Sequence, residues 1–178
     1  GLMSGTSGDG VDASIVSSDG ISQFEVIKNK YYEYDTEIYK AIHHLKEKIS
    51  NKNDLNRLSN QLKDLERKIT LFHAKIVNDL KLKNTDILIG FHGQTIYHNS
   101  YEKISKQLGD GKLLNQLTNK KIVFNFRKKD MENGGEGAPL TPIFHQLLAS
   151  LYKISLPVCI LNIGGISNIT IINKSIGS

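Results

Sequence analysis

The sequence predicts an α/β fold built on a mixed sheet with flanking helices, and three observations support this. Short apolar runs bounded by glycine or polar residues recur along the chain and are typical of buried strands. Two longer stretches carry apolar residues every three or four positions, which is the period of an amphipathic helix. Antiparallel strands come first and helices then alternate with strands, as in α/β domains.

The amino-terminal half is expected to contain three strands and two helices. Residues 2–16 supply two strands around a glycine-rich turn, and residues 24–27 supply a third. Residues 37–49 form one helix, and the apolar spacing over residues 55–80 indicates a long helix with a solvated charged face. His73 lies within this long helix, and we expect it to be a packed or surface histidine rather than a metal ligand.

The second half alternates strands with short helices. The expected elements are, in order, a buried strand at 86–90, a helix at 112–117, a buried strand at 122–126, a helix at 142–153, a buried strand at 158–163 and a strand at 168–172. Proline in the first turn of the helix at 142–153 fits a helix start. Polar residues follow several of these strands, so we expect them at strand ends.

Composition and charge exclude several classes of protein. The 178 residues are 39% hydrophobic and 23% charged, which is typical of a globular chain, and no apolar run approaches a membrane span. Lys and Arg number 23 against 18 Asp and Glu, giving a net charge of +5. The excess is dispersed lysine without a basic stripe interleaved with aromatics, so we expect no nucleic-acid partner.

The single cysteine and the two ends of the chain lead to further expectations. Cys159 lies in an apolar run and is predicted to be a buried thiol, which excludes a disulfide framework and fits a reducing, cytoplasmic location. The sequence begins without Met, shows no signal peptide, and stops just after the strand at 168–172. We therefore expect a fragment of a longer protein.

The opening loop, residues 5–12, is the first candidate site. Its glycines permit close approach and positive φ, its Thr6 and Ser7 add hydroxyls, and a concave run of amides binds phosphate. A plain hairpin turn without a ligand is the alternative. The loop is neither a Walker loop, since no Gly-Lys-Ser/Thr ends it, nor a Rossmann fingerprint, since no helix pattern follows.

Four polar segments are predicted at strand ends, where ligands bind in α/β sheets. They are the opening loop, residues 92–95, residues 127–130 and residues 162–165. Each has a structural explanation when taken alone: His92 as a core histidine, Asp130 as a helix cap or surface charge, and the glycine pair after Asn162 as a turn. Together they indicate one binding site.

The order of these segments resembles the anhydro-N-acetylmuramic acid kinases, within the superfamily of actin, Hsp70 and sugar kinases. The matching blocks are Gly1–Ser7 with Asp9–Asp12, His92–Thr95 with His98, Gly109-Asp110, Phe126-Arg127 with Asp130, Gly134-Gly135 with Gly137–Leu140, Pro142, Phe144-His145, and Leu161–Thr170. They span nearly the whole chain in order.

The resemblance implies an actin-like (ribonuclease H-like) lobe over residues 1–156, and the truncated start of a second lobe over residues 157–178. It implies an ATP-dependent kinase that hydrolytically opens 1,6-anhydro-N-acetylmuramic acid and phosphorylates it to N-acetylmuramic acid 6-phosphate in peptidoglycan recycling. ATP and Mg2+ are the implied cofactors. The implied partners are the amino sugar and ATP, with a homodimer as one option and neither nucleic acid nor membrane.

The resemblance also assigns roles to residues. Asp130 is the implied catalytic base, and Asp9 is the nearest carboxylate for magnesium held through water. The implied ATP-binding residues are Gly5, Thr6, Ser7, Gly8, Asp9, Gly10, Val11, Asp12, Gly164 and Gly165. The implied substrate-binding residues are His92, Gln94, Thr95 and Arg127.

Three positions depart from the family pattern, and two other functions stay open. Gly8 stands where relatives have Leu or Met, Asn125 replaces an Asp, and Glu136 replaces a Gln. Met3 occupies about the position of the superfamily's usual first-hairpin Asp. One alternative is another sugar kinase or ATPase of the superfamily, and the other is a non-catalytic truncated lobe. We expect the 178 residues alone to be inactive, because the cleft needs both lobes.

Overall fold

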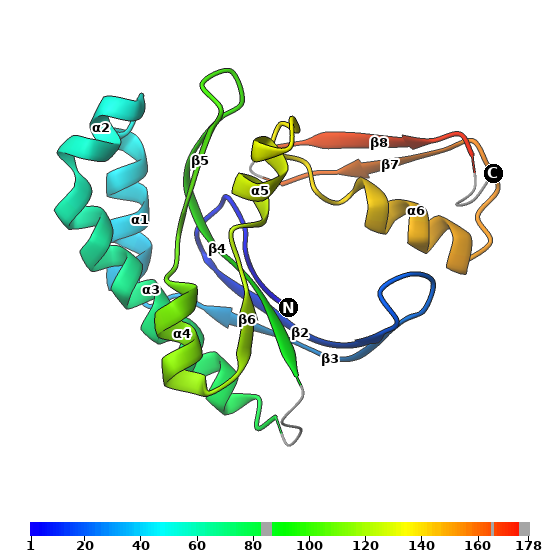
Figure 1. The fold of residues 1–178 in the computed structure, drawn as a ribbon, viewed down its shortest axis with the longest axis horizontal. Coiled ribbons are helices and arrows are strands. Elements are labelled where there is room, and N and C mark those ends of the chain that lie inside the picture. The colour runs from blue at the N-terminus through cyan, green and yellow to red at the C-terminus, as the bar shows by residue number, and fades with distance from the viewer. Residues whose placement is uncertain (83–86, 165, 175–178) are drawn as a thin grey trace.

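A computed structural model describes residues 1–82, 87–164 and 166–174 (Figure 1). Its elements are β1 (Leu2–Ser4), β2 (Gly10–Ser18), β3 (Phe24–Glu33), α1 (Thr36–Lys48), α2 (Lys52–Arg57), α3 (Ser59–Asp79), β4 (Leu88–Asn99), β5 (Ile104–Leu108), α4 (Gly111–Thr118), β6 (Lys121–Val123), α5 (Phe126–Glu132), α6 (Pro142–Leu151), β7 (Val158–Asn162) and β8 (Asn168–Ile172). No helix of the described residues is long and apolar enough to cross a membrane.

The larger sheet is mixed, which confirms the predicted fold class. Its strand order is β3-β2-β1-β4-β5, and β6 pairs with β4. β1 runs parallel to β4 and β6 runs parallel to the start of β4, while the other pairs are antiparallel. Gln94 pairs with Ser4 of β1 and with Leu108 of β5, so β4 is an inner strand at this level.

The main core lies between this sheet and the helices α1 and α3, which sit together with α2 on one side of the sheet (Figure 1). Alternate residues of the strands, such as Leu2, Val11 and Phe91, are buried against isoleucines and leucines of the two helices. This burial follows from the two-residue period of a strand against the helical period of its cover.

The prediction of one helix over residues 55–80 is wrong in one respect, because the structure has two helices there. α2 ends at Arg57 and α3 begins at Ser59, with Leu58 between them outside helical geometry. Leu58 is itself buried, so the apolar spacing continues through the break. The spacing therefore could not reveal where the chain bends.

Two strand predictions in the second half are also corrected. The expected strand at 122–126 is shorter and half-exposed: β6 ends at Val123, and α5 starts at Phe126 after Asn125, whose φ is 63°. The strand expected at 86–90 instead runs from Leu88 to Asn99, since pairing with β5 satisfies its backbone groups, and residue 86 lies outside the described residues. Residues 92–95 are thus inside a strand rather than beyond its end.

A β-bulge at Gly93 decides which way the side chains of β4 point. Leu2 pairs with Phe91 and Ser4 pairs with Gln94, so two steps along β1 correspond to three steps along β4. Gly93 has a φ of +72°, and an added Cβ would lie 2.5 Å from the carbonyl oxygen of Leu108. The extra residue places Phe91 and Gln94 on the helix face and His92 on the opposite, open face.

The second sheet contains β7 and β8, which lie with α6 on the side of the molecule away from α1 and α3 (Figure 1). α6 covers the face with Thr170 and Ile172, and His145 Nδ1 lies 2.8 Å from Thr170 Oγ1. Phe144 of α6 also packs edge-on against Phe24 of β3, with ring centroids 5.0 Å apart.

The prediction of a buried thiol at Cys159 is wrong. Its side chain is exposed, and so are the apolar side chains of Leu161, Ile169 and Ile171, which share its face of the β7–β8 sheet. Apolar character predicted burial, but in the described residues only the opposite face of this sheet is covered. The domain boundary placed after residue 156 falls just before β7 and stays a prediction.

We expect the substitution Gly93→Ala to destabilise the chain by at least about 2 kcal/mol, because a Cβ adds left-handed strain of about 1–2 kcal/mol and also displaces the Leu108 carbonyl. Urea unfolding would measure this loss. The matched control is Gly20→Ala, where φ is +78° but nothing lies within 4 Å of the added Cβ. Equal losses for the two variants would contradict the importance of the bulge.

Candidate active site

The opening loop connects β1 to β2 and is closed by a hydrogen bond of 3.2 Å from the Gly8 amide to the Gly5 carbonyl. Gly8 has a φ of +71°, and a Cβ there would lie 2.9 Å from Ile42 Cγ2. The loop is therefore seated directly on α1. Glycine at this position suits both the backbone conformation and the close approach of the helix.

Within the loop, the polar side chains that the sequence singled out face solvent. Ser7 Oγ donates to Asp9 Oδ1 at 2.6 Å, and the carboxylate of Asp9 stays exposed. Asp12 is also exposed and lies on the open face of the sheet. Val11 is fully buried in the core, so only its backbone is available for a ligand.

Beneath the loop lies a buried polar network. Ser4 Oγ lies 2.8 Å from the Tyr34 hydroxyl and 3.4 Å from His73 Nε2, and His73 Nδ1 lies 2.8 Å from the Ile69 carbonyl oxygen. Burial lowers the pKa of His73 to about 4 and raises the pKa of Tyr34 well above its ordinary value. His73 is thus a packed histidine, the first of the two alternatives that the sequence left open.

Two further side chains reach the loop from below. Gln94, predicted to bind substrate, is fully buried and its Nε2 donates to the Gly5 carbonyl at 2.9 Å. Lys46, which sequence reasoning missed, donates from Nζ to the Thr6 carbonyl. Thr95 is also buried, and its hydroxyl accepts from Gln107 Nε2 at 3.3 Å. The placement of Gln94 and Thr95 does not offer a direct contact with a sugar on the open face.

On the open face, His92 and Arg127 form a pair. Arg127 Nε donates to His92 Nε2 at 2.9 Å, and Arg127 Nη1 donates to the Gly137 carbonyl at 2.8 Å. A guanidinium only donates, so His92 Nε2 accepts and the proton of the ring sits on Nδ1, 2.6 Å from the Gly93 carbonyl oxygen. Burial and the nearby Arg127 charge lower the pKa of His92 to about 4. His92 is a neutral partner that orients Arg127.

Asp130 lies inside α5 and not in a loop or at a helix cap. Its Oδ2 accepts from the Gly137 amide at 2.8 Å. A Cβ on Gly135 would lie 2.1 Å from the same oxygen, so this loop passes directly over the carboxylate. In the described part of the chain, Oδ1 has no hydrogen-bond partner. One oxygen of the carboxylate is thus fixed by the Gly137 amide, and the other has no hydrogen-bond partner among the described residues.

Contacts through β4 bring most of the predicted residues together. Gln94 holds the opening loop, His92 holds Arg127, and Arg127 and Asp130 both bind the backbone of Gly137. A hollow of about 310 Å³ on the open face is lined by Met3, Asp12, Gly90, His92 and Phe126, among others.

Among the described residues, no hydrogen bond brings the second glycine segment to this site. Gly164 lies exposed in the turn after β7, and in the described residues no hydrogen bond joins it to the opening loop. Gly165 lies outside the described residues. The role of this segment stays a prediction.

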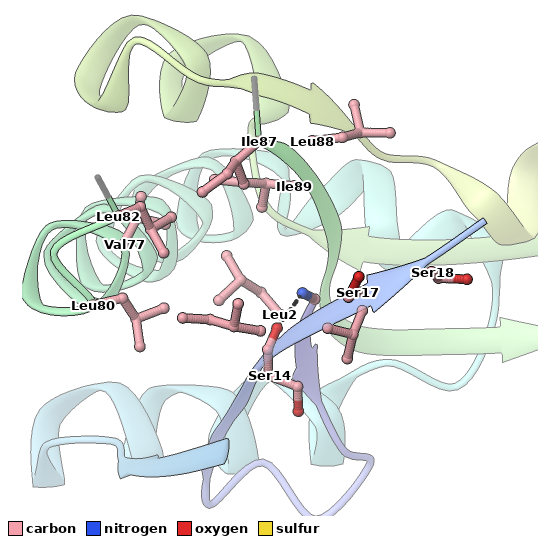
Figure 2. Close-up of a pocket in the computed structure, with 13 residues that line it drawn as sticks. Leu2, Ser14, Ser17, Ser18, Val77, Leu80, Leu82, Ile87, Leu88 and Ile89 are labelled. Carbon is pink, nitrogen blue, oxygen red and sulfur yellow. Dashed lines mark hydrogen bonds between the residues drawn. The ribbon is translucent and has the colours of Figure 1, made fainter. Parts of the chain in front are cut away.

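A larger hollow of about 490 Å³ lies at the other end of β1, away from the opening loop. Figure 2 shows its wall, made by residues such as Leu2, Val77, Leu80 and Ile89 with serines of β2. Among the described residues, its lining includes none of those predicted for the site and no ionisable side chain.

Known proteins resemble this chain over nearly its whole length. The chain matches the family model of anhydro-N-acetylmuramic acid kinase over residues 1–176. It is 58% identical over 175 residues to the protein of that name from Pelagibacter ubique, covering 97% of this chain and 46% of the relative. Relatives of the same name from Gluconobacter oxydans and Rhizobium etli are each 38% identical, with 48% of their length covered. The chain spans about half the length of these curated relatives.

We expect the free energy of unfolding to fall as the pH drops from about 6.5 towards about 4. Both His73 and His92 have a folded-state pKa below the unfolded value of about 6.5, so the unfolded chain binds more protons in this window. Each contributes a slope of up to about 1.4 kcal/mol per pH unit. Their stabilisation is present above pH 6.5 and lost on acidification.

Urea unfolding at several pH values tests this. The variant His73→Phe keeps the ring volume and should remove about half of the slope. The control His44→Gln changes an exposed histidine of α1 and should keep the slope of the unmodified chain. An unchanged slope in His73→Phe would show that the buried histidine does not carry this pH dependence.

Proposed function

Because this chain belongs to the anhydro-N-acetylmuramic acid kinase family, we propose that the protein containing it is an ATP-dependent kinase. It opens 1,6-anhydro-N-acetylmuramic acid with water and phosphorylates the released oxygen, giving N-acetylmuramic acid 6-phosphate. This reaction belongs to peptidoglycan recycling, and we propose that it takes place in the cytoplasm.

The observation that carries this proposal is the hydrogen bonding of the Asp130 carboxylate. One oxygen accepts from the Gly137 amide, the other has no hydrogen-bond partner among the described residues, and Arg127 donates to the carbonyl of the same Gly137. A general base needs a free lone pair on a carboxylate that is held in place. Asp130 meets both requirements.

The proposed reaction proceeds in two steps, and in each step one bond to a heavy atom forms and another breaks. Asp130 accepts a proton from water while the water oxygen bonds to the anomeric carbon, and the bond from that carbon to the 6-oxygen breaks. The 6-oxygen then bonds to the γ-phosphorus of ATP, and the bond from that phosphorus to ADP breaks. Arg127 can stabilise the negative charge that develops, because it is a permanent cation held in one orientation by His92.

The opening loop is the proposed site of the ATP phosphates. Its backbone amides supply donors in a place where a charged oxygen can approach closely, and such donors contribute strongly to transition-state stabilisation. Asp9 fits a magnesium ion held through water, because its carboxylate is exposed, on the loop, and oriented by Ser7. Magnesium would neutralise charge on the phosphate oxygens.

Other expectations from the sequence stay proposals. We propose that residues after 156 begin a second lobe, which would close the cleft from the other side and bring Gly164 and Gly165 to ATP. The homodimer and the absence of a nucleic-acid partner are likewise predictions. Analytical ultracentrifugation and a nucleic-acid binding assay on the whole protein would test them.

We expect the whole protein to transfer the γ-phosphate of labelled ATP to 1,6-anhydro-N-acetylmuramic acid in the presence of Mg2+. The product should be the open sugar phosphorylated at its 6-oxygen. The same assay with N-acetylmuramic acid, which is already open, distinguishes a plain sugar kinase. No transfer to the anhydro sugar by a folded protein would reject the proposal.

We expect Asp130→Asn to lower kcat by about two to four orders of magnitude, which is the usual contribution of a general base. The asparagine oxygen can still accept from the Gly137 amide, so the loop should stay in place. The KM for ATP should change little. Glu132→Gln, on the same helix and half-exposed, is the matched control and should keep normal turnover. Near-normal turnover in Asp130→Asn would remove this carboxylate from the mechanism.

A further inference from the structure

Three carbonyl groups of the opening loop are held from the side of the core. Gln94 Nε2 donates to the Gly5 carbonyl at 2.9 Å, and Lys46 Nζ donates to the Thr6 carbonyl. The amide of Tyr34 donates to the Asp9 carbonyl at 2.9 Å. β4, α1 and the end of β3 therefore each supply one donor to the same loop.

Holding a carbonyl in place also fixes the amide that follows it. A trans peptide is planar, so the C=O of one residue and the N–H of the next point in opposite directions. With the carbonyls of Gly5 and Thr6 turned towards the core, the amides of Thr6 and Ser7 are turned away from it. Over the part of the chain that the structure describes, these two amides have no hydrogen-bond acceptor.

We propose that Gln94 and Lys46 are positioning residues that present the Thr6 and Ser7 amides to the phosphates of ATP. The inference rests on the proposed function for the identity of the anion. It assigns to Gln94 a role through the loop, in place of the direct sugar contact that the family resemblance implied. It also adds Lys46, which no motif of the sequence marked.

The arrangement at both residues is costly for stability, which argues for a role beyond packing. Gln94 is fully buried, yet its Oε1 has no hydrogen-bond partner in the described residues. A buried polar atom without a partner destabilises the folded state, and an apolar side chain of similar size would avoid this. Lys46 keeps a half-buried ammonium group, and burial lowers its pKa. The loop carbonyls satisfy Gln94 Nε2 and Lys46 Nζ, while Gln94 Oε1 keeps its cost.

A second consequence concerns electrostatics. Carbonyl oxygens carry partial negative charge, and a phosphate that meets them is repelled. Gln94 and Lys46 keep the oxygens of Gly5 and Thr6 on the core side, so that a phosphate on the open side meets the Thr6 and Ser7 amides and not these two oxygens. Loss of either donor should allow a peptide of the loop to rotate, and should weaken ATP binding more than sugar binding.

The test uses the whole protein and ATP itself. We expect Gln94→Leu to raise the Kd and the KM for ATP about tenfold, with a smaller change in the KM for the sugar. Thr70→Val is the matched control: it also removes a buried hydroxyl contact, to the Asp110 amide at 3.0 Å, but does not touch the loop. Urea unfolding gives the stability of both variants, and only Gln94→Leu should lose ATP affinity.

Lys46 is tested in the same way. Lys46→Met should raise the Kd for ATP about tenfold, and Lys46→Arg should restore most of the affinity because it keeps a cationic donor. Lys48→Met, which changes an exposed lysine in the same last turn of α1, is the control. In amide NMR spectra, the Thr6 and Ser7 signals should shift on addition of ATP, and should already be displaced in Gln94→Leu without ATP.

The outcomes separate this inference from the proposed function. ATP binding without sugar turnover by the unmodified protein would reject the proposed function. The Kd measurements would still test whether Gln94 and Lys46 position the loop amides. An unchanged Kd for ATP in both Gln94→Leu and Lys46→Met, or losses matched by Thr70→Val and Lys48→Met, would overturn the inference. An unmodified protein that does not bind ATP would overturn both.

Discussion

The β-bulge at Gly93 is the constraint on which the rest of the site depends. It lets a single strand serve both faces of the sheet: His92 on the open face orients Arg127, and Gln94 on the core face holds the opening loop. Without the extra residue, side chains two positions apart would share a face. One glycine thus connects the carboxylate of Asp130 to the loop proposed to bind phosphate, through a strand that is paired on both sides.

Much of the fold could be predicted from apolar spacing. The predictions that failed did so for physical reasons. The strands β1 and β2 and the helix α1 were predicted because one face of each is apolar and the other polar. The strand β3 was predicted only over residues 24–27, although it runs to Glu33, because most of it is exposed. The strand β5, with the sequence Ile104-Ser105-Lys106-Gln107-Leu108, was not predicted, because it is half-buried and has no apolar run. The helix α5 was not predicted, and its start follows Asn125, whose left-handed conformation no local pattern marks.

For the candidate site, the sequence identified residues but not their contacts. The opening loop, Arg127 and Asp130 were found from glycine content and from family blocks. Their partners depend on tertiary structure: Lys46 and Tyr34 reach the loop only because α1 and the end of β3 pack beneath it. The orientation of Gln94 could not be deduced either, because it depends on a bulge and not on the strand period.

The exposed face of the β7–β8 sheet has a consequence for the handling of this chain. Leu161, Ile169 and Ile171 form an apolar strip on a two-stranded sheet, and two strands alone are marginally stable in water. Unpaired edges beside such a strip are templates for pairing with other chains. During synthesis and refolding, this strip is therefore a surface on which two copies of the chain can associate. Chaperone binding or low protein concentration would favour correct assembly, and Cys159 on the same face would report by its reactivity which outcome occurred.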